Sequence, residues 1–333
     1  MPGKQSAIQN SLNVRGEKNS NRNTKERESF FRDFLKQADL QVLVIPAIFL
    51  IVIFSYIPMY GVLMGFQDFQ LGDFPGLSPW VGFRHFKTLL QDPNIPIVMR
   101  NTLVISLLKT VINFPAPILF AVLLNELMGK HFKKAVQTIS YLPHFISWVV
   151  AATLMFDFFS VDNGAVNSAL LGMGIIQEPI HFFGKAEYFW GMSVLTDLWK
   201  GLGWNSIIYF AAISSVDAQL YEAAEIDGAG RFTKMWHITI ATILPTIVLL
   251  FVFNIGGLLN ANFDQIMMLT NQMTNPLLRS HADVLDTYVY RVGLRESRYS
   301  FGAAAGLFKS AVNILLLLAA NKIAGKISGT SVL

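Results

Sequence analysis

Residues 221–231 read Tyr-Glu-Ala-Ala-Glu-Ile-Asp-Gly-Ala-Gly-Arg, and they lie between two long apolar stretches of the chain. Alanine and glutamate favour a helix, and Gly228 can adopt the backbone angles of a tight reversal. A second amphipathic run follows as far as His237. The segment therefore predicts a helix, a turn and a second helix over residues 217–237.

The predicted first helix carries small side chains. Ala223 and Ala224 leave little bulk, so a partner protein could pack closely against them. Glu222 could cap the helix or pair with a cation of that partner.

The composition outside this segment points to the lipid bilayer as solvent. The chain has 333 residues, of which 53% are hydrophobic and only 14% charged, and a water-soluble domain of this length could not easily hide so much apolar surface. The absence of cysteine excludes disulfides, thiolate metal sites and cysteine nucleophiles. The net charge of +4 comes with no basic cluster on a soluble face, so no nucleic-acid partner is predicted.

A membrane-spanning helix needs about 20 mostly apolar residues. Six stretches meet this requirement, and they predict an all-α, polytopic membrane protein with about six transmembrane helices. The predicted spans are 41–65, 98–125, 135–160, 189–214, 239–262 and 302–324. Several contain proline, which predicts kinks.

The first 38 residues are polar and charged, which predicts a largely disordered tail before a transmembrane domain over residues 39–333. Phe30, Phe31, Phe34 and Leu35 recur there at helical spacing. They predict either a short helix on the membrane surface or a soluble lead-in to the first span.

The distribution of lysine and arginine predicts the orientation. Fifteen of these residues lie in the tail, in the connections between spans two and three and between spans four and five, and at the C-terminus, against seven on the opposite side. Both termini and the segment 217–237 are therefore predicted to be cytoplasmic.

From Glu222 to Pro245 the sequence resembles the EAA loop of ATP-binding-cassette (ABC) importer permeases. The pattern runs Glu-Ala-Ala, three residues, Gly, nine residues and Ile-x-Leu-Pro. The positions that match are Glu222, Ala223, Ala224, Gly228 and Ile238. The Leu-Pro of the pattern falls on Ile240 and Ala241, and the nearest proline is Pro245.

The resemblance covers nearly the whole chain after residue 40. Residues 78–82, 101–103, 286–291 and 299–302 are similar to carbohydrate permeases of the binding-protein-dependent family, most of all to those for alginate, pectin-derived and other complex oligosaccharides. The resemblance implies the type I ABC importer permease fold. It also implies a multi-pass protein of the bacterial cytoplasmic (inner) membrane that imports a sugar or oligosaccharide, alginate and pectic oligosaccharides being candidates.

In that family the loop docks on an ATPase dimer. The resemblance therefore implies that Glu222, Ala223, Ala224, Asp227 and Gly228 couple this chain to such a dimer. Further implied partners are a second homologous permease subunit, an extracytoplasmic solute-binding protein and membrane lipid. ATP and Mg²⁺ belong to the partner ATPase, and no cofactor is expected in this chain.

The chain itself lacks the motifs of an enzyme. None of its Gly-Lys pairs is followed by the Ser or Thr of a P-loop, because residues 5, 131, 186 and 327 are Gln, His, Ala and Ile. The six histidines form no ligand pattern. We therefore expect no catalytic residue and no metal site.

An ionisable side chain within a span costs free energy unless it is paired, so each one is a candidate functional residue. Asp197 and Lys200 are three residues apart, so they are predicted to neutralise each other on one helix face. The alternative is that they contact the substrate directly. Lys109 and Lys309 are assigned no site. Gly201 and Gly203 predict close helix packing in span four.

A polar stripe in span five predicts part of a substrate path. Gly256, Asn260 and Asp264 recur every four residues, with Asn254 and Asn262 nearby. Sugars offer hydroxyls and flat apolar faces, so aromatic side chains could complete the path. The predicted path residues are Trp199, Trp204, Tyr209, Asn254, Asn260, Phe263 and Asp264. The same residues could instead hold helices together or face lipid.

Two other classes compete with the importer. An ion-gradient-driven secondary transporter should show inverted repeats and buried coupling carboxylates, and no internal repetition is evident. A membrane enzyme should show catalytic acids or histidines clustered at one membrane face, and none is found.

Overall fold

The computed structural model describes residues 38–127 and 129–328, and among these residues every regular element is a helix. The predicted all-α class is therefore confirmed. Residues 1–37 of the predicted tail, with the surface helix predicted there, lie outside the described residues.

The described residues fall into two compact units, which are divided between Gly61 and Val62. In the first unit, α2 (Ala38–Ile51) continues through a π-helical turn, η1 (Val52–Tyr56), into η2 (Ile57–Phe66), which reaches into the second unit. The continuous helix Gln41–Phe66 has 26 residues. At about 1.5 Å per residue this run is longer than the hydrocarbon core of about 30 Å.

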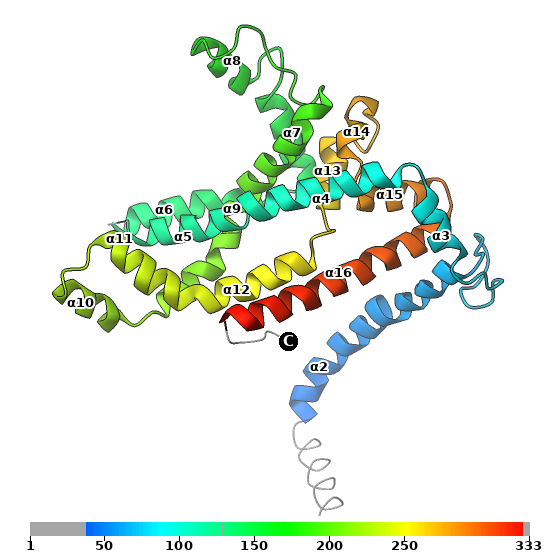
Figure 1. Ribbon diagram of the computed structural model, residues 1–333, viewed down its shortest axis with the longest axis horizontal. Coiled ribbons are helices and arrows are strands. Elements are labelled where there is room, and N and C mark those ends of the chain that lie inside the picture. The colour runs from blue at the N-terminus through cyan, green and yellow to red at the C-terminus, as the bar shows by residue number, and fades with distance from the viewer. Residues whose placement is uncertain (1–37, 128, 329–333) are drawn as a thin grey trace, which may run out of the picture. The chain divides into compact units, whose positions relative to one another are not determined.

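The second unit contains the remaining helices (Figure 1). The long helices are α4 (Ile95–Ile112), α5 (Pro115–Asn125), α6 (Lys130–Tyr141), α7 (Trp148–Phe158), α9 (Phe189–Ser214), α12 (Ala241–Gly256) and α16 (Tyr299–Ser328). The shorter elements are α3 (Arg84–Gln91), η3 (Leu142–Phe145), α8 (Ala165–Gly172), η4 (Ala186–Tyr188), α10 (Ala218–Ile226), α11 (Arg231–Lys234), η5 (Met235–Ile240), α13 (Phe263–Leu269), η6 (Pro276–Leu278), α14 (Arg279–Ala282), α15 (Leu285–Tyr290) and η7 (Arg291–Arg295).

Among the described residues, four helices are long and apolar enough to cross a membrane, and a bent helix pair raises the number to at most five. The four are Gln41–Phe66, Ile95–Asn125, Arg231–Gly256 and Tyr299–Lys326. The predicted span 189–214 coincides with α9, a helix of 26 residues that carries several polar side chains. The chain is thus a multi-pass membrane protein, and the count of six spans stays a prediction.

The predicted third span, 135–160, is not one straight helix. Lys130–Phe145 and Trp148–Phe158 are bent by 107° relative to each other. Pro143 has no backbone N–H to continue the first helix. Ser147 has an extended backbone and caps the second helix, its Oγ accepting from the Val150 N–H at 3.3 Å.

The predicted fifth span, 239–262, is misplaced by several residues. The helix begins at Arg231 and ends at Gly256, after which residues 257–262 are irregular. Gly257 ends the helix, because its N–H turns back to the carbonyls of Phe253 and Asn254. The predicted stripe therefore does not lie on one helix: Asn260 and Asp264 both follow the break.

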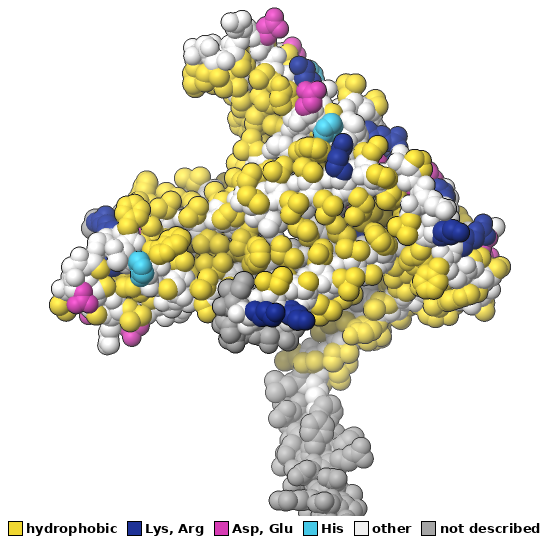
Figure 2. Space-filling view, viewed as in Figure 1, with side chains coloured by type: hydrophobic (Ala, Val, Ile, Leu, Met, Phe, Trp, Pro, Cys, Tyr) yellow, Lys and Arg dark blue, Asp and Glu magenta, His cyan; other side chains and the backbone are white. Residues whose placement is uncertain are grey.

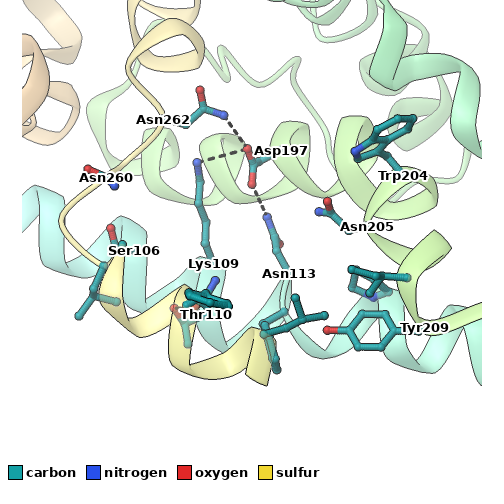
Figure 3. A pocket seen from close by; sticks show the side chains of 18 residues that line it. Ser106, Lys109, Thr110, Asn113, Asp197, Trp204, Asn205, Tyr209, Asn260 and Asn262 are labelled. Carbon is teal, nitrogen blue, oxygen red and sulfur yellow. Dashed lines mark hydrogen bonds and ion pairs between the residues drawn. The ribbon is translucent and has the colours of Figure 1, made fainter. Parts of the chain in front are cut away.

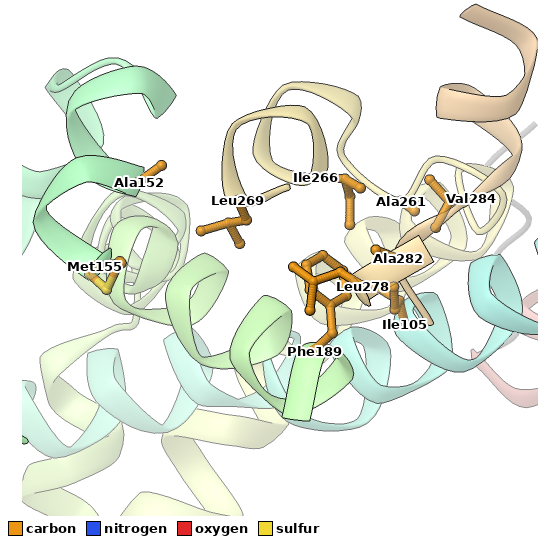
Figure 4. Packing of buried hydrophobic residues seen from close by; sticks show 10 residues of the cluster. All are labelled: Ile105, Ala152, Met155, Phe189, Ala261, Ile266, Leu269, Leu278, Ala282 and Val284. Carbon is orange, nitrogen blue, oxygen red and sulfur yellow. The ribbon is translucent and has the colours of Figure 1, made fainter. Parts of the chain in front are cut away.

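Helix α9 lies at the centre of the second unit and contacts α4, α5, α6 and α12. Its first residue, Phe189, is fully buried in a cluster built from α4, α7, α13 and the chain from 278 to 284 (Figure 4). The predicted close packing is confirmed at Gly203, where a Cβ atom would lie 2.2 Å from the Ser140 carbonyl oxygen. Small residues let helix backbones approach in this way.

Candidate functional site

The segment 217–237 forms the predicted helix-turn-helix. Asp217 caps α10, since its Oδ1 accepts from the Gln219 N–H at 3.0 Å. The reversal after α10 occurs at Gly228, whose φ of 75° is left-handed and favours glycine. Beyond it, α11 and η5 run without a break into α12, so the loop is continuous with a predicted span.

Two contacts tie α10 to the helix that follows the turn. The Tyr221 hydroxyl lies 2.9 Å from the hydroxyl of buried Thr239. Lys234 Nζ lies 3.7 Å from Glu225 Oε1, and the Glu225 side chain is 75% exposed. The hydroxyl contact fixes the helix more firmly, because exposed ion pairs contribute little.

The outer face of this loop is open. Glu222, Ala223, Asp227 and Gly228 are exposed, whereas Ala224 is half-buried. Large apolar side chains of the loop are exposed as well. These are Leu220, Ile226, Phe232 and Trp236, the most exposed being Ile226 at 89%. Exposed apolar patches of this kind mark surfaces that a partner covers.

A cavity of about 590 Å³ lies between α4, α5, α9, α12 and the irregular segment 257–262. Its lining mixes amides and hydroxyls with aromatic rings (Figure 3). Four predicted path residues line it: Trp204, Tyr209, Asn254 and Asn260.

The other three predicted path residues do not line the cavity. Trp199 packs against the hydrophobic cluster around Phe189. The ring of Phe263 packs against that of Tyr290, with centroids 5.4 Å apart. Asp264 is exposed in the first turn of α13. The break after Gly256 explains the positions of Phe263 and Asp264, because it turns the chain away from the direction of α12.

Asp197 is the centre of the polar network in the cavity. Its carboxylate accepts from Asn113 Nδ2 and from Asn262 Nδ2, each at 3.0 Å, and lies 3.5 Å from Lys109 Nζ (Figure 3). Lys109 also donates to Gln265 Oε1 at 2.6 Å and to the Ala261 carbonyl at 3.3 Å. The network thus joins α4 and α9 to the irregular segment.

The predicted Asp197–Lys200 pair is wrong. Lys200 Nζ donates to the carbonyl oxygen of His144 at 2.7 Å and lies 5.5 Å from the ring centre of Trp148. These partners belong to the bent region between α6 and α7. Two side chains three residues apart can meet on a helix, but here a neighbouring helix or helix break offers each a better partner.

Sequence reasoning missed Lys109, Asn113, Asn205 and Asn262 as cavity residues. A signal for the first two was present in the sequence. Polar residues recur at helical spacing along α4, at Ser106, Lys109, Thr110 and Asn113, and all four line the cavity. Asn262 lies beside the predicted polar stripe but is not among the predicted path residues. Asn205 belongs to no comparable pattern, because its position in the cavity depends on how α9 packs.

A second polar network lies outside the spans, where Tyr288 OH donates to Asp92 Oδ2 at 2.6 Å. Burial raises the pKa of Asp92, but hydrogen bonds from Tyr288 and Asn94 outweigh it, and the net pKa lies below its ordinary value. Burial and the same hydrogen bond raise the pKa of Tyr288. This contact fastens α15 to the turn between α3 and α4.

The fold and the loop define a multi-pass helical membrane protein that presents an exposed helix-turn-helix. Residues 113–328 match the family described as "Binding-protein-dependent transport system inner membrane component". The chain belongs to this family and is therefore a permease component of an ABC importer.

Two relatives from Bacillus subtilis are similar to this chain over most of their own length. Protein LplB of Bacillus subtilis (strain 168) is 44% identical, with 86% of this chain and 88% of the relative covered. The polygalacturonan/rhamnogalacturonan transport system permease protein YteP of the same organism is 41% identical, with 90% and 92% covered.

A solved structure has the same fold. It is a crystal structure of a bacterial ABC transporter involved in the import of the acidic polysaccharide alginate. One of its chains has a TM-score of 0.80 and 38% identity, covering 90% of this chain and 99% of that one.

Proposed function

We propose that this chain is one half of a heterodimeric permease that imports an oligosaccharide released from an acidic polysaccharide, of the alginate or pectin class. The observation that carries the proposal is the similarity, 41% and 38% identity over 90% of this chain, to permeases named for polygalacturonan/rhamnogalacturonan and for alginate. A relative named for another class of sugar is less similar: the arabinooligosaccharide permease AraP of Bacillus subtilis is 27% identical to this chain.

The cavity offers chemistry suited to a sugar. Asn113, Asn205 and Asn254 line it and could hydrogen-bond hydroxyl groups. Trp204 and Tyr209 line it too, and aromatic faces stack on the apolar faces of sugar rings. Lys109, already paired with Asp197, is the cation nearest to a carboxylate that enters the cavity.

Transport would be driven from outside this chain. A partner ATPase dimer, holding ATP and Mg²⁺, docks on the loop 217–237, where Ile226, Phe232 and Trp236 offer exposed apolar contacts. A binding protein delivers the sugar at the opposite face. In support, the structural relative of the alginate system has been solved with an alginate-pentasaccharide-bound periplasmic protein.

The arrangement of basic residues supports a cytoplasmic loop. Helices α6, α10 and α11 lie toward one end of the second unit and α3 and α15 toward the other (Figure 1). Lys130, Lys133 and Lys134 begin α6, and Arg231 and Lys234 lie in α11. The sequence assigns the eight cations of residues 1–38, Lys322 and Lys326 to the same side, which then has fifteen cations against seven and is expected to be cytoplasmic.

The test is uptake of labelled oligosaccharides by cells that carry or lack this gene. We expect deletion to abolish uptake of galacturonate or mannuronate/guluronate oligomers, and the intact gene to restore it. Neutral arabino-oligosaccharides serve as the control substrate. Restored uptake of the neutral sugar alone would contradict the acidic class.

The same cells separate ATP-driven import from an ion-gradient carrier. Uptake should stop when the catalytic residues of the ATPase are inactivated. If it continues in that strain but stops when a protonophore collapses the ion gradient, the secondary-transporter alternative is correct.

A further inference from the structure

The loop between η2 and α3, residues 67–83, buries two polar side chains and exposes several large apolar ones. Gln67 and Ser78 are only 2% and 8% exposed, whereas Leu71 and Leu77 are 80% and 82% exposed. Asp68, Gln70 and Asp73 of the same loop are exposed as well, so the unusual feature is the exposure of the large apolar side chains.

Hydrogen bonds within the loop fix its shape. Gln67 pairs with Trp80 in an antiparallel bridge, and Gln67 Oε1 accepts from the Gly76 N–H at 2.9 Å. Ser78 Oγ donates to Asp73 Oδ2 at 3.1 Å. The exposed apolar side chains are therefore presented by an ordered loop, whose buried polar side chains, Gln67 and Ser78, are hydrogen-bonded within the loop.

Aromatic side chains extend the apolar surface toward α3. The rings of Phe66 and Trp80 stack with centroids 5.6 Å apart, and the edge of Phe83 meets Phe66 at 5.5 Å. Trp80 and Phe83 nevertheless remain 63% and 73% exposed. In α3, which follows, Lys87 is exposed while Leu89 is buried.

The loop is attached to the start of the span α16. The Phe69 N–H donates to Ser300 Oγ at 2.9 Å, and the rings of Phe69 and Tyr299 meet edge to face. Tyr299 and Ser300 are the first residues of the candidate span Tyr299–Lys326. Ser300 and the loop bound to it then lie where the hydrocarbon core meets the lipid headgroups.

The apolar surface of the spans extends to the end of the second unit where α3 lies. Hydrophobic side chains cover much of the face over α4, α12 and α16 and reach the region around α3 (Figure 2). Tryptophan, phenylalanine and leucine beside a few cations are the side chains that favour the membrane interface.

We propose that residues 71–83 form an interfacial anchor, whose apolar side chains insert among the lipid headgroups at this membrane surface. In the predicted orientation this is the outer leaflet. The anchor would hold the start of α16 and the helix α3 at a fixed depth, on the side where a binding protein would dock.

The chain contains no cysteine, so single-cysteine variants can report the surroundings of one side chain. Leu77→Cys and Leu71→Cys would each carry an environment-sensitive fluorophore, and exposed Asn163 in Asn163→Cys gives a water-facing reference. The full chain, with the subunits that purify with it, is placed in phosphatidylcholine/phosphatidylglycerol vesicles. Quenchers are aqueous iodide and lipids with a nitroxide near the headgroup or near the end of the acyl chain.

We expect blue-shifted emission at Leu71→Cys and Leu77→Cys, weak quenching by iodide, and stronger quenching by the shallow nitroxide than by the deep one. Quenching by iodide equal to that at Asn163→Cys would overturn the proposal, since the loop then faces water. Protection from iodide and from both nitroxides would overturn it in favour of a protein partner. Stronger quenching by the deep nitroxide would exclude the headgroup position.

Discussion

At Gly228 the backbone φ is 75°, a value that proline cannot adopt because its ring holds φ near about −65°. Gly228→Pro should therefore displace α11 relative to α10 and prevent capture of the ATPase while the chain still inserts in the membrane. Co-purification with the ATPase subunits and sugar uptake are the measurements.

A matched control lies two residues further on. Gly230 has a φ of −71°, and an added Cβ atom would meet nothing within 4 Å. Gly230→Ala should therefore leave ATPase capture and uptake unchanged. Normal uptake by Gly228→Pro would show that the turn is not needed for coupling.

The Lys109–Asp197 pair gives a second prediction at single residues. Lys109→Met removes the cation that lies 3.5 Å from the carboxylate of Asp197, whose side chain is 26% exposed. Asp197 keeps its hydrogen bonds from Asn113 and Asn262 but loses its cation, which should cost about 1–3 kcal/mol of folding free energy. We expect a lower unfolding midpoint in detergent, measured by tryptophan fluorescence.

The double variant Lys109→Met/Asp197→Asn should recover part of the lost folding free energy, because it leaves neither charge of the pair without its counter-ion. Lys322→Met, at an exposed position in α16, is the control. Equal midpoints for Lys109→Met and Lys322→Met would mean that the pair does not stabilise the protein.

Among the elements, the irregular segment after α12 depends on Asn262. Its φ of 67° is left-handed, its Oδ1 accepts from the Gln265 N–H at 3.3 Å to cap α13, and its Nδ2 donates to Asp197. Asn262→Gly loses both hydrogen bonds, but glycine adopts the left-handed backbone without strain. Asn262→Ala loses both hydrogen bonds and also carries a Cβ atom that strains this backbone.

We therefore expect Asn262→Ala to be less stable than Asn262→Gly by about 1 kcal/mol, the cost of a left-handed residue that carries a Cβ atom. Thermal unfolding of both variants measures this difference. The reverse order would indicate that the backbone of the segment relaxes without strain.

The hydrogen bond between Tyr288 and Asp92, which attaches α15 to the turn before α4, predicts that the stability of the fold depends on pH. The pKa of Asp92 in the folded chain lies below its ordinary 3.8, so the carboxylate stabilises the fold above that pH and loses this effect as the pH falls. The pKa of Tyr288 lies above its ordinary 10.0, so the phenol stabilises the fold below that pH and loses the effect as the pH rises.

Tyr288→Phe should thus cost about 1–2 kcal/mol at neutral pH. This difference should shrink as the pH falls below 3.8 and through the lowered pKa of Asp92. Unfolding midpoints of the two proteins across the pH range provide the test. A difference that is constant from neutral to acid pH would assign the effect to packing rather than to the hydrogen bond with Asp92.

At the scale of the whole molecule, the orientation can be tested with the same cysteine-free chain. Gln219→Cys lies in the loop predicted to be cytoplasmic, and Asn163→Cys lies at the other predicted side. In intact spheroplasts, a membrane-impermeant maleimide should label Asn163→Cys and not Gln219→Cys.

In inside-out vesicles the labelling should be the reverse. Labelling of Gln219→Cys from outside the cell would place the loop beyond reach of an ATPase. The proposed coupling would then be wrong, although the family membership would stand.

The sequence by itself determined the helical class, the multi-pass architecture and the helix-turn-helix over 217–237. These features depend on local properties, namely apolar length, helix propensity and a glycine at the turn. The bounds of α9 were predicted correctly for the same reason.

Only the tertiary structure decided the polar interior. It paired Asp197 with Lys109 instead of Lys200, ended α12 at Gly256, and bent the helix after Pro143. Spacing along one helix shows which side chains share a face, but not which neighbouring helix that face meets. A buried charge takes the partner with the best geometry, and that partner can lie far away in the sequence.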